Sequence, residues 1–326
     1  MTDRQYLSEA NAAEIAKFYS SAQDTLGKYI VGNQQVIETI LIGMLAEGHI
    51  LIEGVPGTGK TSIAKAVAFI TGCDFNRIQG TVDVQPADMI GVRVYDSVTR
   101  KFSLQKGPIF TNVLLVDEIN RINPKAQSAF IEGMSERQVT LDGNTTSLRP
   151  PFFVIATQNP REFEGTFPLI EVQRDRFMFS LNTGHLEKDE ELMIVKRASD
   201  GFLSRNEYEF LLEPVISQDR LTQMIDEVTT VRIEEPVLSY IRDLVVATRH
   251  HNDIELGASS RASLAFVRGA KARAACLGRT YVLPDDVKAI AQATLIHRIR
   301  LSAEAEVEGI RTDNIITEIL KNTEVL

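Results

Sequence analysis

The stretch Gly54–Thr61 constrains this chain more than any other part of its sequence. It reads Gly-Val-Pro-Gly-Thr-Gly-Lys-Thr, which fits the pattern G-x-x-x-x-G-K-[ST], and it lies between an apolar run (49–53) and a helical pattern (62–70). A strand, a glycine-rich turn and a helix in this order point several main-chain N–H groups at a phosphate, and the helix N-terminus adds partial positive charge. The predicted phosphate-binding residues are Gly54, Val55, Pro56, Gly57, Thr58, Gly59, Lys60, Thr61 and Ser62.

Two side chains of this stretch have separate expected roles. We expect Lys60 to reach the β- and γ-phosphates of a nucleoside triphosphate and the Thr61 hydroxyl to bind Mg²⁺. A helix entry with spare glycines is the alternative interpretation. The strand and helix expected on either side argue against it.

A second element, residues 112–118, ends in two acids. Its continuous apolar run predicts a central parallel strand that is buried on both faces. Asp117 and Glu118 then lie at the carboxyl end of the strand, where open α/β sheets bind ligands. We expect Asp117 to hold Mg²⁺, directly or through water, and Glu118 to act as the base that polarises the attacking water. A strand ending in solvated acids is the alternative.

Two further places have an open interpretation. Residues 151–157 predict another buried strand, and Asn159 just beyond it is placed to bond a water or a γ-phosphate, although an Asn before Pro can also be a turn residue. Ile30 and Val31 form a short apolar step before Gly32. They can form a shelf for a base or belong only to the core.

Composition limits the class of protein. The 326 residues are 44% hydrophobic and 24% charged, as in an ordinary globular protein, and the two cysteines provide no disulfide framework or metal cluster. No apolar run is as long as a membrane span and the N-terminus has no apolar signal core, so we expect a cytoplasmic protein. The net charge of −9 disfavours general attraction to nucleic acid.

The pattern of elements changes near residue 184. Before it, we expect helices at 8–27 and 34–46, strands at 74–79 and 177–181, a helix at 124–136, a hairpin around Asp142-Gly143-Asn144, and a second hairpin in a loop-rich insertion at 80–108. After it, helical periodicity covers 187–199, 217–230, 235–250, 260–277 and 284–300. We therefore predict an α/β nucleotide-binding domain (1–184), with a central parallel sheet and helices on both faces, followed by a smaller all-helical lid domain (185–326).

These motifs together resemble the MoxR family of AAA+ ATPases over nearly the whole chain, from about residue 29 to about residue 300. The stretches that carry the resemblance are Gly48–Gly54, Gly107–Phe110, Asp117–Arg121, Glu136–Thr140 and Ala156–Pro160. The resemblance implies an AAA+ domain with ATP and Mg²⁺ as ligands, a helical lid, and assembly into a ring, usually a hexamer. It also implies that the 80–108 insertion remodels the central pore.

The resemblance assigns roles to particular residues. Asn159 matches the sensor-1 position and Arg261 matches sensor 2, which reaches from the lid back to the phosphates. Arg176 matches the arginine finger, which acts on ATP bound by the neighbouring subunit. Ile30 and Val31 match the adenine-side contact. Arg174 stands where the family usually has Leu, so either arginine can be the finger, and the intact Asp-Arg-Phe triplet favours Arg176. A surface ion pair is the alternative for each arginine.

The function implied by the resemblance is ATP hydrolysis used for chaperone-like remodelling, maturation, or metal or cofactor insertion in a partner protein, often one with a von Willebrand factor A domain. One alternative is the ATPase motor subunit of a magnesium-chelatase-like complex. A nucleic-acid motor is the other, and the acidic net charge disfavours it.

Overall fold

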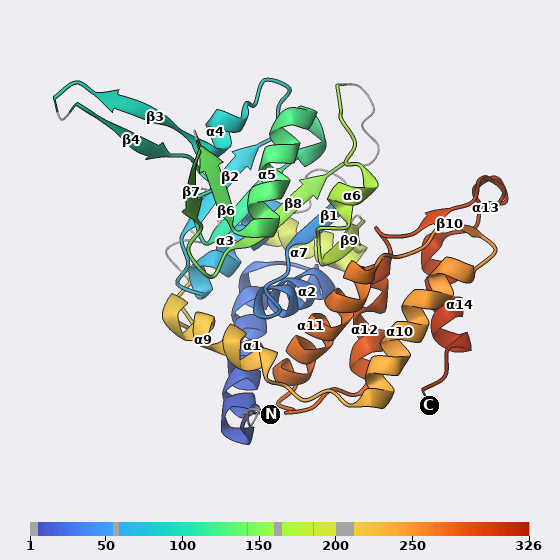
Figure 1. The fold of residues 1–326 in the computed structure, drawn as a ribbon. Helices are drawn as coiled ribbons and strands as arrows, with labels where there is room; N and C mark the ends of the chain where they lie inside the picture. The colour runs from blue at the N-terminus through green and yellow to red at the C-terminus, as the bar shows by residue number, and fades with distance from the viewer. Residues whose placement is uncertain are drawn as a thin grey trace, which may run out of the picture.

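A five-stranded parallel sheet is the centre of the fold (Figure 1). The structure, a computed structural model, describes residues 6–54, 59–98, 100–141, 143–159, 165–184, 186–199 and 212–325. The strands run in the order β2-β5-β8-β1-β9, and every neighbouring pair is parallel. They are β1 (Ile50–Gly54), β2 (Phe75–Gln79), β5 (Val113–Asp117), β8 (Phe153–Gln158) and β9 (Phe179–Thr183).

The sheet is covered on both faces, as the burial of successive residues of its strand β5 shows. Along β5, Val113 and Leu115 belong to one apolar cluster, whereas Leu114 and Val116 belong to a second one. All four side chains are fully buried. Because successive side chains of a strand point to opposite faces, each cluster marks one face of the sheet. The continuous apolar run therefore folds as the expected central strand.

Helices supply the other half of each cluster. The first cluster includes side chains of α1 (Glu9–Tyr29), α2 (Gln34–Leu45) and α3 (Lys60–Ile70). The second includes side chains of α4 (Pro86–Ile90) and α5 (Pro124–Glu136). The prediction of an α/β fold with helices on both faces of a parallel sheet is confirmed. Two short turns, η1 (Ile119–Arg121) and α6 (Glu171–Arg174), complete this part.

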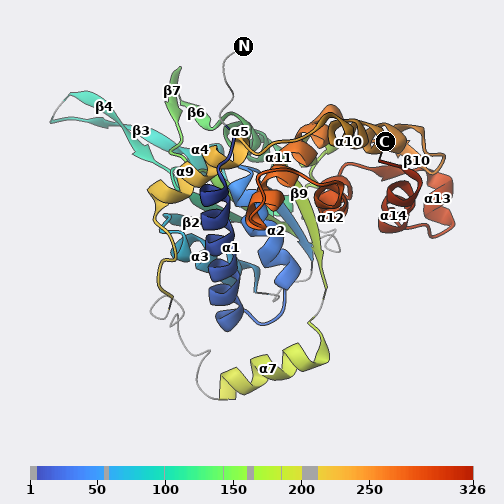
Figure 2. The ribbon, with the colours of Figure 1, turned by 90° about the horizontal axis from the view of Figure 1, so that it is seen from below.

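Two antiparallel hairpins extend from this core. One pairs β3 (Gly91–Asp96) with β4 (Lys101–Lys106), as expected for the insertion, and projects far from the body in both orientations (Figures 1 and 2). The other pairs β6 (Gln138–Leu141) with β7 (Asn144–Ser147), also as expected. Both are two-stranded sheets of their own.

The C-terminal part is helical, as predicted. Its elements are α7 (Lys188–Ser199), α9 (Gln218–Thr229), α10 (Glu235–His250), α11 (Ser260–Cys276), α12 (Pro284–Leu295), α13 (Ala303–Val307) and α14 (Thr312–Asn322), with the short strands β10 (Ile254–Leu256) and β11 (Arg300–Leu301). Helix α1 lies against α9 and α11, so apolar contacts cross the predicted division at residue 184. That division stays a prediction. None of the helices within the described ranges is long and apolar enough to cross a membrane.

One predicted helix is shorter than expected. Residues 284–300 carry a helical pattern, but α12 ends at Leu295 and Arg300 is already in β11, which pairs with β10. Beyond the helix, the His297 ring and the Arg298 guanidinium both bond to the main-chain oxygen of Phe177. These bonds and the strand pairing replace the helical bonds that the pattern predicted.

Candidate nucleotide-binding site

Helix α3 begins directly after the glycine-rich turn. Gly59, its N-cap, has a left-handed backbone (φ 78°), which glycine adopts without strain. The Lys60 ammonium donates to the main-chain oxygen of Gly54 at 2.8 Å. Burial lowers the pKa of Lys60, and the negative charges of Asp117 and Glu118 oppose that shift, so the two acids act electrostatically on this lysine. Thr61 and Ser62 follow in the first turn of α3. Of the expected phosphate-binding residues, Val55, Pro56, Gly57 and Thr58 lie outside the described residues.

Position 54 must be glycine because the end of β1 lies very close to the end of β9. A Cβ atom built on it would lie 2.1 Å from Oγ1 and 2.3 Å from the main-chain oxygen of Thr183. These are distances that no side chain can tolerate, so only glycine lets β1 end beside β9.

The two carboxylates at the end of β5 share a threonine on the neighbouring strand. The Thr157 hydroxyl donates to Oδ1 of Asp117 at 2.5 Å and accepts the main-chain N–H of Glu118 at 3.0 Å. Thr157 itself is 2% exposed, so its hydroxyl is shielded from water, whereas the Asp117 side chain is 18% exposed. Arg77 on β2 pairs with the other oxygen of Asp117 at 2.7 Å. Three adjacent strands therefore fix the orientation of Asp117.

Glu118 lies in a turn with unusual backbone geometry. Its φ of 55° and ψ of 52° are left-handed, which is uncommon for a residue other than glycine. The carboxylate accepts from Gln79 at 3.1 Å and lies 3.4 Å from the Arg121 guanidinium. A Cβ at position 80 would meet the main-chain oxygen of Glu118 at 2.1 Å, so Gly80 leaves room for this turn.

Asn159 follows β8 at the same edge of the sheet. Its main-chain oxygen accepts from Asn120 at 3.4 Å. Because β1, β8 and β5 are adjacent and parallel, their carboxyl ends bring Lys60, Asp117, Glu118 and Asn159 to one edge. The four residues expected to act on the phosphates are therefore grouped.

The segment expected on the adenine side joins α1 to α2. Ile30 is half-buried against the first apolar cluster, and Val31 is 9% exposed. Helix α7 lies against this segment, because Arg197 donates to the main-chain oxygen of Tyr29 at 2.8 Å. Both the base shelf and a core role remain compatible with this placement.

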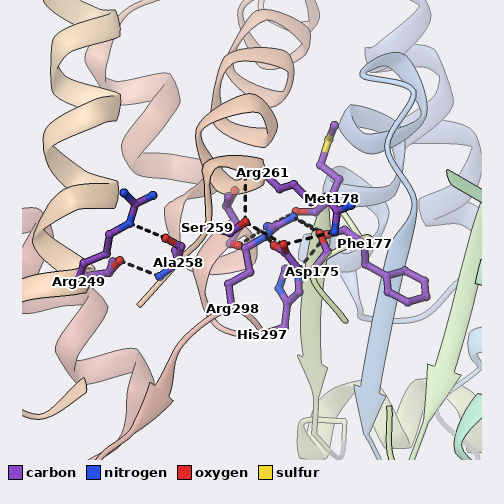
Figure 3. Close-up of polar contacts among 11 residues, drawn as sticks. Asp175, Phe177, Met178, Arg249, Ala258, Ser259, Arg261, His297 and Arg298 are labelled. Carbon is purple, nitrogen blue, oxygen red and sulfur yellow. Dashed lines mark hydrogen bonds and ion pairs between the residues drawn. The ribbon is translucent and has the colours of Figure 1, made fainter. Parts of the chain in front are cut away.

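The two predicted arginines lie elsewhere. Arg176 precedes β9, so it lies at the amino edge of the sheet, and it donates to the Ser135 hydroxyl at 2.7 Å. Arg261, in the first turn of α11, lies 3.6 Å from the Asp175 carboxylate (Figure 3). A five-residue strand separates the two edges by roughly 16 Å.

Both arginines line one open pocket of about 260 Å³. Its other charged side chains are Glu47, Arg137, Asp175, Arg268 and Arg298. The structure therefore groups Arg261 with Arg176 and does not bring it to Lys60 of the same chain. The start of α11 faces the turn before β9, and the expected reach of Arg261 to the phosphates stays a prediction. The Nε atom of Arg174, by contrast, is buried and has no hydrogen-bond partner among the described residues.

Known proteins share this architecture. Residues 49–179 match the family described as "ATPase family associated with various cellular activities (AAA)", and residues 246–319 match the AAA lid domain. The uncharacterised protein YeaC of Bacillus subtilis is 42% identical over 93% of each chain. Chaperone MoxR1 of Mycobacterium tuberculosis is 38% identical, over 90% of this chain and 78% of the relative. A crystal structure of a provisionally assigned ATPase from Cytophaga hutchinsonii is 40% identical, with a TM-score of 0.89 over 98% of both chains.

The fold and these matches define an AAA-class ATPase in which a nucleotide-binding domain precedes a helical lid. Within that class, the chain belongs to the MoxR family of AAA+ ATPases, and it is an enzyme that hydrolyses ATP.

The sequence motifs gave no role to several side chains that the structure places at the site. Thr157 belongs to the stretch Ala156–Pro160 that carries the resemblance but was given no role there, and Arg77 and Gln79 read only as polar residues of a short strand. A search for polar side chains at the carboxyl ends of the strands would have found Thr157 and Gln79, because parallel strands end together, whereas Arg77 lies in the middle of β2. In the sequence, Asp175 served only to identify the Asp-Arg-Phe triplet and received no role of its own.

Proposed function

We propose that Lys60, Asp117, Glu118 and Asn159 form the hydrolytic half of the ATP site. The observation that carries this proposal is the Thr157 hydroxyl, which joins the Asp117 carboxylate and the Glu118 main chain at the edge where α3 begins. Glu118 activates the attacking water, Asn159 helps to orient that water, and Lys60 binds the β- and γ-phosphates. The loop 54–61 and Ser62 hold the triphosphate through main-chain N–H groups, and Ile30 and Val31 contact the adenine.

The donor set fits Mg²⁺. Thr61 would hold the ion through its hydroxyl and Asp117 through its carboxylate, and oxygen donors of this kind, completed by water and phosphate, are those that Mg²⁺ prefers. When bound, the ion neutralises charge on the phosphates. Thr157 donates to one Asp117 oxygen and Arg77 pairs with the other, so these two residues orient the carboxylate for that role.

Arg176 and Arg261 complete the site of a neighbouring protomer. Both line one pocket at the amino edge of the sheet, whereas Lys60 lies at the carboxyl edge. A ring in which the amino edge of one chain meets the carboxyl edge of the next brings the parts together, and the family usually forms hexamers. Arg176 is favoured over Arg174 as the finger, because it lines the open pocket while the Nε atom of Arg174 is buried.

The biological role that we propose is chaperone-like remodelling or maturation of a client, including insertion of a metal or cofactor, in the cytoplasm. The relative MoxR1 is named a chaperone, and its similarity extends over most of both chains. A protein with a von Willebrand factor A domain is the proposed client. We keep 1–184 and 185–326 as the two functional domains.

Mixing two inactive variants tests the composite site. Lys60→Ala removes the phosphate-binding lysine and leaves the finger, whereas Arg176→Ala does the reverse. A finger of this kind is worth roughly 10³–10⁵ in rate, so each variant alone should be nearly inactive. At equal mixing, about one interface in four combines an intact nucleotide site with an intact finger, so activity should recover to about that share of wild type. No recovery in rings shown to be mixed would refute a finger supplied by the neighbour.

A further inference from the structure

We propose that Asp175 is the positioning residue for Arg261, and that it sets the place of the lid arginine relative to Arg176. This inference rests on the proposed function, in which both arginines act on the nucleotide of a neighbouring protomer. It adds a residue that does not itself reach that nucleotide.

The Asp175 carboxylate joins three parts of the chain (Figure 3). It belongs to the turn before β9, next to Arg176. One oxygen accepts from Nε of Arg298, beyond the end of α12, at 2.9 Å. The other accepts from the hydroxyl of Ser259, the N-cap of α11, at 2.8 Å and lies 3.6 Å from Arg261.

The first of these contacts is an anchor. The Arg298 side chain is 2% exposed, and it also donates to the main-chain oxygens of Met178 at 2.9 Å and Phe177 at 2.6 Å. A buried guanidinium with several acceptors has little freedom to move. Arg298 therefore fixes the Asp175 carboxylate in place, because the guanidinium is buried and the carboxylate is only 17% exposed.

The second contact connects the anchor to Arg261. The Ser259 hydroxyl donates to Asp175 and accepts the main-chain N–H of Arg261 at 3.1 Å. One hydroxyl thus links the fixed carboxylate to the backbone from which the Arg261 side chain starts. The position of that backbone relative to the turn before β9 follows from this link.

The segment is also held from its other side by α10. Arg249 donates to the main-chain oxygen of Ala258 at 2.9 Å, and the main-chain N–H of Ala258 donates to the Thr248 hydroxyl at 3.0 Å (Figure 3). A Cβ at Gly257 would lie 2.6 Å from the main-chain oxygen of Thr248. The start of α11 is therefore clamped between α10 and Asp175.

The Arg261 guanidinium itself is held only loosely. Its side chain is 46% exposed and its distance to Asp175 is that of a weak ion pair. Asp175 thus aims the side chain into the pocket without satisfying its five donors, so they remain available for a phosphate. Fixing the backbone from which these donors extend reduces the reorganisation that is needed when they meet a phosphate.

Ser259→Ala is the variant that tests this link, because it breaks the connection and keeps the Asp175–Arg298 pair. Its matched control is Ser217→Ala, which removes the N-cap serine of α9, away from Asp175. Ser259→Thr keeps the hydroxyl. The assay is steady-state ATP hydrolysis by the full chain at saturating Mg²⁺ and ATP, with unfolding midpoints measured for all variants.

We expect Ser259→Ala to lower kcat about two- to tenfold, the range that one lost hydrogen bond explains, and Ser259→Thr to restore it. Ser217→Ala should leave kcat unchanged. In an Arg261→Ala background, Ser259→Ala should have no further effect, a result that a general loss of stability would not produce.

Three results would overturn the proposal. The first is a wild-type kcat in Ser259→Ala although Arg261→Ala has a reduced kcat, and the second is an equal reduction of kcat in Ser217→Ala. The third is a double variant whose kcat is reduced by the product of the two single reductions. If Arg261→Ala alone hydrolyses ATP at the wild-type rate, the assignment of Arg261 under the proposed function fails instead, and the positioning role fails with it.

Discussion

Replacing Thr157 with Val perturbs the site at one atom. Valine has nearly the shape of threonine, so the change replaces a hydroxyl by a methyl group in a side chain that is 2% exposed. Two hydrogen bonds are lost, one to the Asp117 carboxylate and one from the main-chain N–H of Glu118.

The two lost hydrogen bonds determine how much the free energy of unfolding should fall. A hydrogen bond to a charged group contributes about 1.5–3 kcal/mol, and a neutral one about 0.5–1.5 kcal/mol. Asp117 keeps its pair with Arg77 and is 18% exposed, so water compensates for part of the first loss. We therefore expect the free energy of unfolding to fall by about 2 kcal/mol. Without these bonds the Asp117 and Glu118 carboxylates are less well oriented. This loss of orientation should lower kcat and raise the Mg²⁺ concentration needed for half-maximal activity.

Urea unfolding without nucleotide, together with ATP hydrolysis as a function of Mg²⁺ concentration, measures both effects. Thr71→Val is the control, because this fully buried hydroxyl bonds to main-chain oxygens of α3 and to no group of the proposed site among the described residues. The control should lose stability and keep its Mg²⁺ dependence. If Thr157→Val keeps both its stability and its Mg²⁺ dependence, the reasoning that Thr157 orients the carboxylates is refuted.

Three further predictions concern other parts of the chain. Glu118→Gln should bind ATP and hydrolyse it roughly 10²–10⁴-fold more slowly, because the general base is lost, and near-normal turnover would contradict its role. Arg298→Met should lower the free energy of unfolding by about 3 kcal/mol, because it removes a buried guanidinium from the Asp175 carboxylate and from the main-chain oxygens of Phe177 and Met178. Arg242→Ala on the surface should have little effect, and equal losses in a urea titration would show that burial is not the cause. Burial lowers the pKa of His49 from 6.5 to about 3 and that of His297 well below 6.5. Between these values the unfolded chain binds more protons than the folded chain. The free energy of unfolding should therefore fall as the pH decreases from about 6.5 toward 3. For His49 alone the fall is about 1.4 kcal/mol per pH unit, and His49→Gln should flatten the profile; an unchanged slope would count against a neutral buried imidazole.

Much of the fold could be predicted because local pattern and tertiary environment agree. The run 112–118 is apolar on both faces and becomes β5 in the middle of the sheet. The alternating residues around 92–94 and 102–104 become the β3–β4 hairpin. In each case the residues that make the pattern are those that the observed burial or pairing uses.

The rest depends on contacts that are distant in sequence. The end of α12 at Leu295 follows from bonds between residues 297–298 and Phe177, some 120 positions away. The periodicity of 284–300 does not contain that information. Likewise, a motif can assign a role to Arg261, but only the packing of α11 shows at which edge of the sheet the residue lies.

That packing has a consequence for assembly. If Lys60 and Arg176 must meet, the contact between protomers is heterologous, because two different surfaces of the same chain face each other. A dimer with two-fold symmetry would pair each surface with a copy of itself and leave both hydrolytic sites incomplete. Such contacts either close after a whole number of copies or continue as an open helix. If Arg176 acts in this way, ATP hydrolysis requires a closed or continuing series of chains, and the specific activity should rise with protein concentration.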